Sequence, residues 1–170
     1  MMRALVLGLL LMAAPVSAQE GRVIPEHGRF TIIEEADMKP DPSLRYRVIF
    51  EVSSMAPRRG YERVARMMNL LGTGGVTMQP GDIAVVVHGA PIDALLTDAA
   101  HAKRYEGKPN PNKALINALM AAGADVRLCG QTARGRGVSK DELLPGVKLD
   151  TSAITTMATL QLKGWVMIQD

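Results

Sequence analysis

The sequence predicts an α/β protein with a five-stranded, mostly parallel sheet and helices on both faces, in three layers. The run Ile83-Ala84-Val85-Val86-Val87 is continuously apolar, which is typical of a parallel strand covered on both faces. Along the chain, such runs alternate with segments whose apolar residues recur at helical spacing. Because parallel neighbours need crossover connections, this alternation indicates a sheet built from β-α units.

Each element is predicted from its periodicity and from the residues that bound it. Strands are predicted where apolar residues alternate or run together, and helices where they recur every three or four positions. Glycines close several of the helices, and Pro91 suits a first helical turn. The predicted strands span 45–52, 83–87, 124–130, 147–149 and 165–168. The predicted helices lie between them: 61–71, one from 91 that frays after Ala100, 112–122, a short one from 139 to 144, and 152–163 with Met157 and Leu160 inward.

The connections between these elements carry their own signals. Residues 53–60, 103–111 and 131–138 are expected to be loops, the last of them rich in glycine and arginine. Asn112 is placed to cap a helix, and Ser139-Lys140-Asp141-Glu142 fits a capping box. The order of the strands does not follow from the pattern, although five strands suit a flavodoxin-like or Rossmann-like arrangement.

The amino terminus has the order of a secretory signal peptide over residues 1–18. Arg3 precedes an apolar run from Ala4 to Ala14, and the small residues Val16-Ser17-Ala18 follow Pro15. The apolar run is shorter than the roughly 20 residues that a membrane-spanning helix needs. We therefore expect cleavage after Ala18, a periplasmic or secreted location, and no membrane span in the mature chain.

The rest of the chain is predicted to be one domain with an amino-terminal extension. Residues 19–44 are mixed and polar and contain several prolines, which indicates an extended arm, and residues 45–170 form the α/β domain. The formal net charge of +3 falls by one when Arg3 is removed. So small a charge argues against a general nucleic-acid-binding protein.

Cys129 is the single cysteine, and it lies at the carboxyl end of the predicted strand 124–130. In open α/β sheets, ligands bind beyond this end of the strands. A single cysteine forms no disulfide within the chain, and its thiolate would be favoured by nearby cations, of which Arg127, Arg134 and Arg136 are candidates. The alternative is that Cys129 is a small, buried core residue.

Two further groups are candidates for a site near Cys129. His88 ends the strand 83–87, so it is a candidate base or hydrogen-bond partner at the same edge of the sheet; the alternative is that it only caps the strand. The guanidinium groups of Arg134 and Arg136, separated and followed by glycines, suit an anion-binding loop. The alternative for this loop is a solvated surface segment.

Several classes of site have no signal in the sequence. The glycines match neither the dinucleotide-binding fingerprint nor a Walker loop, and His27, His88 and His101 lack zinc-like spacing. No serine-hydrolase motif is present, and core filling explains the scattered methionines better than copper binding does. We expect no cofactor and no metal.

A family resemblance adds to this interpretation. The residues that carry it are Tyr46 to Val52, Asp82 to Gly89, Asn110-Pro111-Asn112, Val126 to Gly130, and Leu144 to Gly164. In these segments the chain resembles the DsrE/DsrF-like family of sulfur-relay proteins, and in particular its exported, single-domain members. The resemblance implies a five-stranded parallel α/β fold and assembly into trimers or hexamers. It also implies that a cysteine at the end of a central strand, here Cys129, holds sulfane sulfur as a persulfide.

The resemblance therefore favours a periplasmic sulfur carrier or sulfurtransferase-like protein. In it, Cys129 would accept sulfane sulfur while Arg134 or Arg136 steadies the thiolate, and the sulfur donor and acceptor are not identified. Two alternatives remain open: a non-catalytic oligomeric binding or assembly module in which Cys129 is buried, and a thiol redox sensor. Whether the protein turns over as an enzyme is also open.

Overall fold

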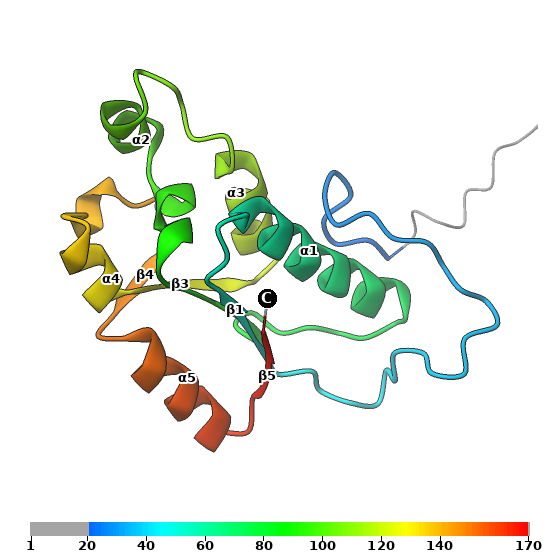
Figure 1. The fold of residues 1–170 in the computed structure, drawn as a ribbon. Helices are drawn as coiled ribbons and strands as arrows, with labels where there is room; N and C mark the ends of the chain where they lie inside the picture. Colours follow the sequence, from blue (N-terminus) through cyan, green and yellow to red (C-terminus); the bar gives the residue numbers. More distant parts are fainter. Residues whose placement is uncertain (1–20, 170) are drawn as a thin grey trace, which may run out of the picture.

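A five-stranded, all-parallel sheet with helices on both faces forms the centre of the protein (Figure 1). The computed structural model describes residues 21–169. The predicted fold class is confirmed. The signal peptide predicted over residues 1–18 lies outside the described residues.

All five predicted strands are present, with ends that differ by at most three residues from those expected. The strands are β1 (Val48–Val52), β2 (Ile83–Val87), β3 (Asp125–Cys129), β4 (Lys148–Asp150) and β5 (Val166–Gln169). The helices are α1 (Pro57–Thr73), α2 (Asp98–Arg104), α3 (Lys113–Ala121), α4 (Gly130–Gly135) and α5 (Ala153–Leu162), with 3₁₀ turns η2 (Ala90–Leu95) and η3 (Lys140–Glu142).

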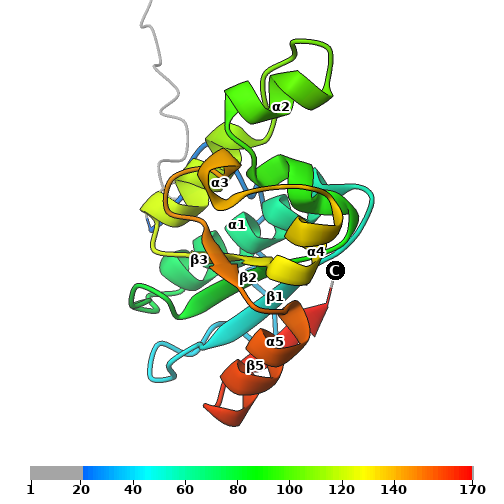
Figure 2. The same cartoon turned by 90° about the vertical axis from the view of Figure 1, so that its left-hand side faces the viewer.

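The strand order is β4-β3-β2-β1-β5. Strands β1 to β4 step across the sheet in one direction, and β5 then returns to pair with the other side of β1. A flavodoxin-like order, in which β1 lies between β2 and β3, is therefore wrong. Because crossovers are right-handed, the reversed step from β4 to β5 places α5 on the opposite face from α1 and α3 (Figures 1 and 2).

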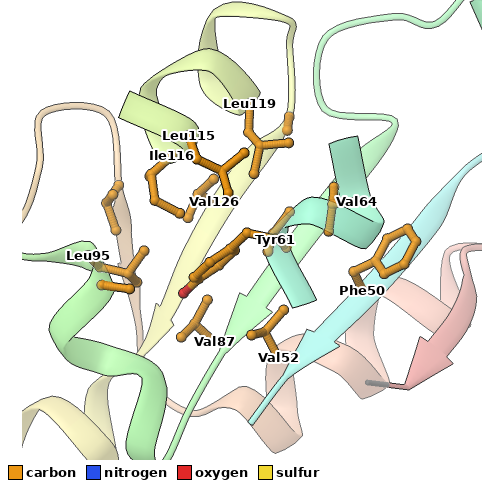
Figure 3. Close-up of a cluster of buried hydrophobic side chains, with 14 of the residues drawn as sticks. Phe50, Val52, Tyr61, Val64, Val87, Leu95, Leu115, Ile116, Leu119 and Val126 are labelled. Carbon is orange, nitrogen blue, oxygen red and sulfur yellow. The ribbon is translucent and has the colours of Figure 1, made fainter. Parts of the chain in front are cut away.

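The larger core lies between the sheet and the layer formed by α1, η2 and α3. Tyr61 of α1 and Leu115 of α3 are fully buried there, over side chains that point up from alternate positions of the strands. Figure 3 shows ten of its residues by label: Phe50, Val52, Tyr61, Val64, Val87, Leu95, Leu115, Ile116, Leu119 and Val126.

A smaller core lies on the other face, beneath α5. Met157 and Leu160 are half-buried against it, which confirms their predicted inward orientation. Trp165 and Met167, next to and in β5, also pack against this cluster. The buried residues of this cluster are Ile49, Val86, Cys129 and Ala153.

Three helical segments differ from the expectation. Helix α1 begins at Pro57, inside the segment expected to be a loop, because proline suits the first helical turn. The segment after Pro91 forms a 3₁₀ turn and not an α-helix. The Thr97 side chain then accepts a hydrogen bond from the Ala100 amide and starts α2, which continues to Arg104, so the expected fraying after Ala100 is wrong.

The segment 131–138, expected to be a loop, contains helix α4. Gly130 is the first residue of this helix, and a Cβ there would lie 2.5 Å from the Asp150 carbonyl oxygen. The glycine thus permits a close approach between β3 and the residues that follow β4. The predicted capping box of Ser139 and Glu142 is confirmed, although it starts only the single turn η3.

Asn112 occupies the N-cap position of α3, but its side chain makes no capping hydrogen bond. The nearby Asn110 takes the structural role instead. Its buried amide donates to the carbonyl oxygens of Ala94 and Leu96, at 2.9 and 2.7 Å, and its Oδ1 accepts from the Asn112 amide. Asn110 thereby ties the start of α3 to the turn η2.

Residues 21–44 form no helix or strand, but their first part packs on α1. Ile24 is buried, and its amide and carbonyl bond to the side chain of the fully buried Asn69, at 2.8 and 3.0 Å. Gly28 has a φ of +65°, and a Cβ there would lie 2.3 Å from the carbonyl carbon of Ala65. This part of the segment therefore lies directly against the α1 backbone.

Candidate functional site

Cys129 is the last residue of β3 and the N-cap residue of α4. Its side chain lies on the α5 face, at the carboxyl edge of the sheet. The residue is 6% exposed, whereas Ile49 and Val86 of the same cluster are 0% and 1% exposed. The thiol is therefore a free cysteine at the outer limit of the smaller core.

Hydrogen-bond donors from two elements converge on the Cys129 sulfur. Burial raises the pKa of the Cys129 thiol, but the backbone amides of Ala153, Thr132 and Gln131 and the hydroxyl of Thr132 donate to the sulfur. Because these donors stabilise the negative charge, the pKa lies below the ordinary value for cysteine. These donors are neutral groups, and they make the thiolate easier to form than in an ordinary cysteine.

Thr132 connects the thiol to the end of the neighbouring strand. Its Oγ1 accepts a hydrogen bond from the Gly89 amide at 3.2 Å. A hydrogen bond from the same hydroxyl is one of the causes that lower the pKa of the Cys129 thiol. The loop after β2 thus orients one of the donors to the thiol.

A charge network beside the thiol fixes the start of α5. Asp150 accepts hydrogen bonds from Arg127 to both carboxylate oxygens, at 3.0 Å each, and from the hydroxyl of Thr156 at 2.8 Å. Thr156 lies in the first turn of α5, which also presents the Ala153 amide to the sulfur. The network therefore holds that amide in place.

Arg127 was a sequence candidate for the cation that favours the thiolate, and the structure gives it another role. Its guanidinium also pairs with Asp125, with Nη2 at 2.7 Å from the carboxylate. Lys148 of β4 pairs with the same carboxylate at 2.9 Å. Arg127 thus faces two carboxylates and braces β3 against β4.

His88 lies next to Cys129 in the register of the sheet. Val87 pairs with Leu128, so His88 and Cys129 are the following positions on neighbouring strands. His88 also follows Val86 by two residues, which directs both side chains to the α5 face. Within residues 21–169, the hydrogen bonds of the imidazole do not include one to Cys129.

The partner of His88 is Glu51, a residue that the sequence interpretation missed. The His88 Nε2 and Glu51 Oε1 atoms lie 2.8 Å apart, and the two side chains are 30% and 16% exposed. A carboxylate within the otherwise apolar strand Val48–Val52 was the available signal, because an unpaired charge is costly in a buried strand. Acid and imidazole therefore occupy the ends of β1 and β2, beside the thiol of β3.

The two predicted anion-binding arginines lie farther along α4. Arg134 is exposed, and Arg136 follows the last turn of the helix. Arg136 Nη1 lies 3.5 Å from Oδ2 of Asp93, in the segment after β2. The hydrogen bonds to the Cys129 sulfur come from other residues, so the structure brings His88, and not Arg136, alongside the thiol.

The histidines and carboxylates of residues 21–169 form no metal site. No group of three or more histidine, cysteine, aspartate or glutamate side chains there is arranged to hold a metal ion. His27 instead bonds to Glu62, and the His101 imidazole bonds to the Lys108 carbonyl oxygen. In the same residues, no helix has the length and apolar character to cross a membrane.

Fold and site together define the class: a parallel α/β protein that holds one ionisable thiol at the carboxyl edge of an inner strand. Within that class, the chain belongs to the DsrE/DsrF-like family, whose model matches residues 48–169. The resemblance noted from the sequence is confirmed. The match begins at the first residue of β1, so the segment packed on α1 lies outside it.

Two solved structures are similar to this chain in fold. One is described as a protein of unknown function, MTH1491 from Methanobacterium thermoautotrophicum, with a TM-score of 0.59 and 22% identity over 74% of this chain and 99% of that one. The other is the ychN protein from E. coli, with a TM-score of 0.51 and 16% identity over 74% and 99%. No curated protein matches the chain. At these identities the likeness concerns the fold alone.

Proposed function

We propose that this protein is an exported sulfur carrier or sulfurtransferase-like protein that holds sulfane sulfur as a persulfide on Cys129. Membership of the DsrE/DsrF-like family suggests a sulfur-relay type of role. The observation that carries the finer proposal is the set of donors from Ala153, Thr132 and Gln131 that converge on the sulfur and lower the thiol pKa. A thiolate is the form that attacks sulfur.

The proposed loading step is a thiol exchange at the terminal sulfur of a donor persulfide, R–S–SH. The Cys129 thiolate forms a new S–S bond to the outer sulfur, the donor S–S bond breaks, and R–S⁻ leaves with the electron pair of that bond. An acceptor thiolate reverses these events and leaves Cys129 as a thiolate again. No external oxidant or reductant is required, because one S–S bond replaces another.

In this proposal, His88 is the group that accepts and donates a proton. Its position beside Cys129 in the register suits a group that takes the thiol proton and returns it to the leaving R–S⁻. Glu51 fixes the imidazole from the far side through the 2.8 Å contact.

Loading the purified protein with polysulfide and measuring its intact mass tests the proposal. We expect a gain of one sulfur atom that reductant removes and that is absent in Cys129→Ser. A thiol that stays unmodified in the native state but reacts once the protein is unfolded would contradict the proposal. That result would favour the alternative of a binding or assembly module, which the small exposure of Cys129 supports.

We also propose that the protein is a homo-oligomer, as a trimer or hexamer. Ile154 and Leu162 of α5 are 76% and 89% exposed, and with Ala158 they form one stripe at spacing of four residues. Val166 of β5 is also 61% exposed, but it lies on the opposite face of the sheet, the face of its register partner Val48. Light scattering after size exclusion tests this, and a monomer at micromolar concentration in the wild type would contradict it.

The proposed periplasmic location depends on the signal peptide over residues 1–18. The order of Arg3, the apolar run and the small residues before Gln19 supports it. Amino-terminal sequencing of the protein recovered from the periplasm of an expressing bacterium tests it. We expect a chain that begins at Gln19, and recovery of the uncleaved chain from the cytoplasm alone would contradict the proposal.

A further inference from the structure

Apart from the thiol site, a cavity lies at the carboxyl edge of the sheet, on the side of α2 and α3. Its volume is about 420 Å³, which falls within the range of roughly 300–1,000 Å³ typical of small-molecule sites. The segments that follow β1 and β2 contribute to its wall, as does the end of α4. Loops at this edge are where open α/β sheets hold ligands.

The wall of this cavity is mostly apolar, with most of its polar groups joined in one corner and with Asn112 as a further polar residue of the lining. The polar corner contains Asp93, Tyr105 and Arg136, with His101 stacked on the Tyr105 ring at 4.3 Å between ring centroids. His101 donates from Nδ1 to the Lys108 carbonyl oxygen and is thereby fixed. The apolar lining residues are Met55, Pro57, Ala90, Pro91, Ala94 and Pro111.

Arg136 is the group in this corner with the most unused hydrogen-bonding capacity. A guanidinium has five N–H donors, and within residues 21–169 Arg136 uses one of them, in the 3.5 Å contact with Asp93. Oδ2 of Asp93 also accepts the Tyr105 hydroxyl at 2.6 Å, so part of its negative charge is already balanced. The remaining donors of Arg136 are free to meet a second anion.

We propose that this cavity binds a small organic anion that has a short apolar body. The anionic group would lie on the free donors of Arg136, and the apolar body would cover the proline and methionine wall. A guanidinium forms paired hydrogen bonds with carboxylate or sulfonate oxygens, and burial of the body adds the hydrophobic contribution. An organic cation is disfavoured, because the Asp93 carboxylate in this corner already accepts from Tyr105 and Arg136, whereas most donors of Arg136 are unused.

The cavity is distinct from the thiol site but connected to it through α4. Thr132, which donates to the Cys129 sulfur, accepts from the Gly89 amide, and Gly89 immediately precedes the lining residue Ala90. Arg136 lies four residues after Thr132. The binding proposal does not require a reactive thiol, so its failure and the failure of persulfide loading are separable.

Hexane-1-sulfonate is a suitable probe, because its charge does not change with pH and its body is apolar. We expect saturable binding to the full mature protein in calorimetry, with amide shifts in NMR spectra confined to the lining residues. Arg136→Gln should weaken binding about tenfold, the cost of one charge-assisted contact. Arg134→Gln is the matched control, because Arg134 lies two residues before Arg136 but does not line the cavity, and its binding should match the wild type.

Two further measurements complete the test. Hexylammonium should neither bind nor compete, and Cys129→Ser should bind the sulfonate with unchanged affinity. The proposal would be overturned by equal binding of the sulfonate and the ammonium ion, by absence of saturable binding, or by equal losses in Arg136→Gln and Arg134→Gln. Thermal unfolding of each variant verifies that it is folded.

Discussion

The imidazole of His88 and the carboxylate of Glu51 are joined by a 2.8 Å contact at the ends of β2 and β1, beside the strand that ends in Cys129. Three neighbouring strands thus end in an acid, an imidazole and a thiol on one face of the sheet. The sequence spacing of these residues is large, and only the parallel pairing brings them together. Such a row is an arrangement in which an acid orients a base that serves a nucleophile.

Glu51→Gln is expected to slow sulfur transfer from loaded Cys129 to a small thiol, because the His88 ring loses the carboxylate that orients it. We expect a reduction of about tenfold, and one of about 100-fold or more in His88→Gln, which loses the acid-base group itself. Stopped-flow transfer rates measured against pH would show it. The amount of sulfur loaded at equilibrium should not change, which separates a positioning role from loss of the thiol site.

A comparable pair elsewhere provides the control for that experiment. Glu62 of α1 bonds to His27, in the segment packed on that helix, at 3.3 Å and away from the thiol. Glu62→Gln should therefore leave the transfer rate unchanged. Equal slowing in Glu51→Gln and Glu62→Gln would mean that both act through general destabilisation, and the positioning role of Glu51 would be wrong.

Thr132→Val is expected to raise the pKa of the Cys129 thiol, because burial already raises it and the valine removes a hydroxyl that donates to the sulfur. The alkylation rate of the native protein by iodoacetamide, measured against pH, should show a midpoint at higher pH than in the wild type. Thr132→Ser keeps the hydroxyl and should retain the low midpoint. A midpoint that is the same in all three proteins would contradict the assignment of Thr132.

Glu142 makes the stability of the protein depend on acid pH. Its hydrogen bonds from Arg104, and then from the Ser139 amide, hold its pKa at about 2, below the ordinary 4.5. Because the pKa is lower in the folded state, this contribution is fully present above pH 4.5 and is lost as the pH falls through about 2. The free energy of unfolding should decrease over that window in urea titrations.

Glu142→Gln should flatten this part of the pH dependence, since glutamine does not titrate. Glu106→Gln is the control, because Glu106 and its partner Lys108 are 87% and 73% exposed and 3.6 Å apart. Exposed pairs of this kind contribute little to stability. An unchanged acid dependence in Glu142→Gln would contradict the assignment of the low pKa.

Local patterns predicted most of the fold and part of the site. The run Ile83–Val87 and the inward spacing of Met157 and Leu160 identify their elements, because burial imposes a period on neighbouring residues. The strand order was not predictable in this way, since the return of β5 to β1 depends on contacts between distant segments. Helix α4 was missed because Gly130 serves a close backbone approach to Asp150.

The candidate site also has a part that the local sequence predicts and a part that depends on the folded structure. Cys129 and His88 were found because strand ends are visible in the sequence, whereas the donors to the sulfur are backbone amides that any residue carries. Ala153 is the clearest case, because only its backbone amide, placed at the start of α5, acts on the thiol pKa. Arg127 had the charge expected of a thiolate partner, but two carboxylates already pair with it.

Asp150→Asn provides the strongest test of how α5 controls the thiol. The change removes a carboxylate that accepts from Arg127 and Thr156, so the first turn of α5 loses its anchor to β3 and β4. The Ala153 amide should then donate less well to the sulfur, and the pKa of Cys129 should rise. We also expect the free energy of unfolding to fall by about 1–3 kcal/mol, the cost of weakening hydrogen bonds to a charged group, while Arg127 keeps its pairing with Asp125. Lys148→Gln, at the exposed end of the same network, should affect neither the thiol pKa nor the transfer rate. If Asp150→Asn destabilises the protein but leaves the alkylation midpoint unchanged, the network stabilises the fold without setting the chemistry of Cys129.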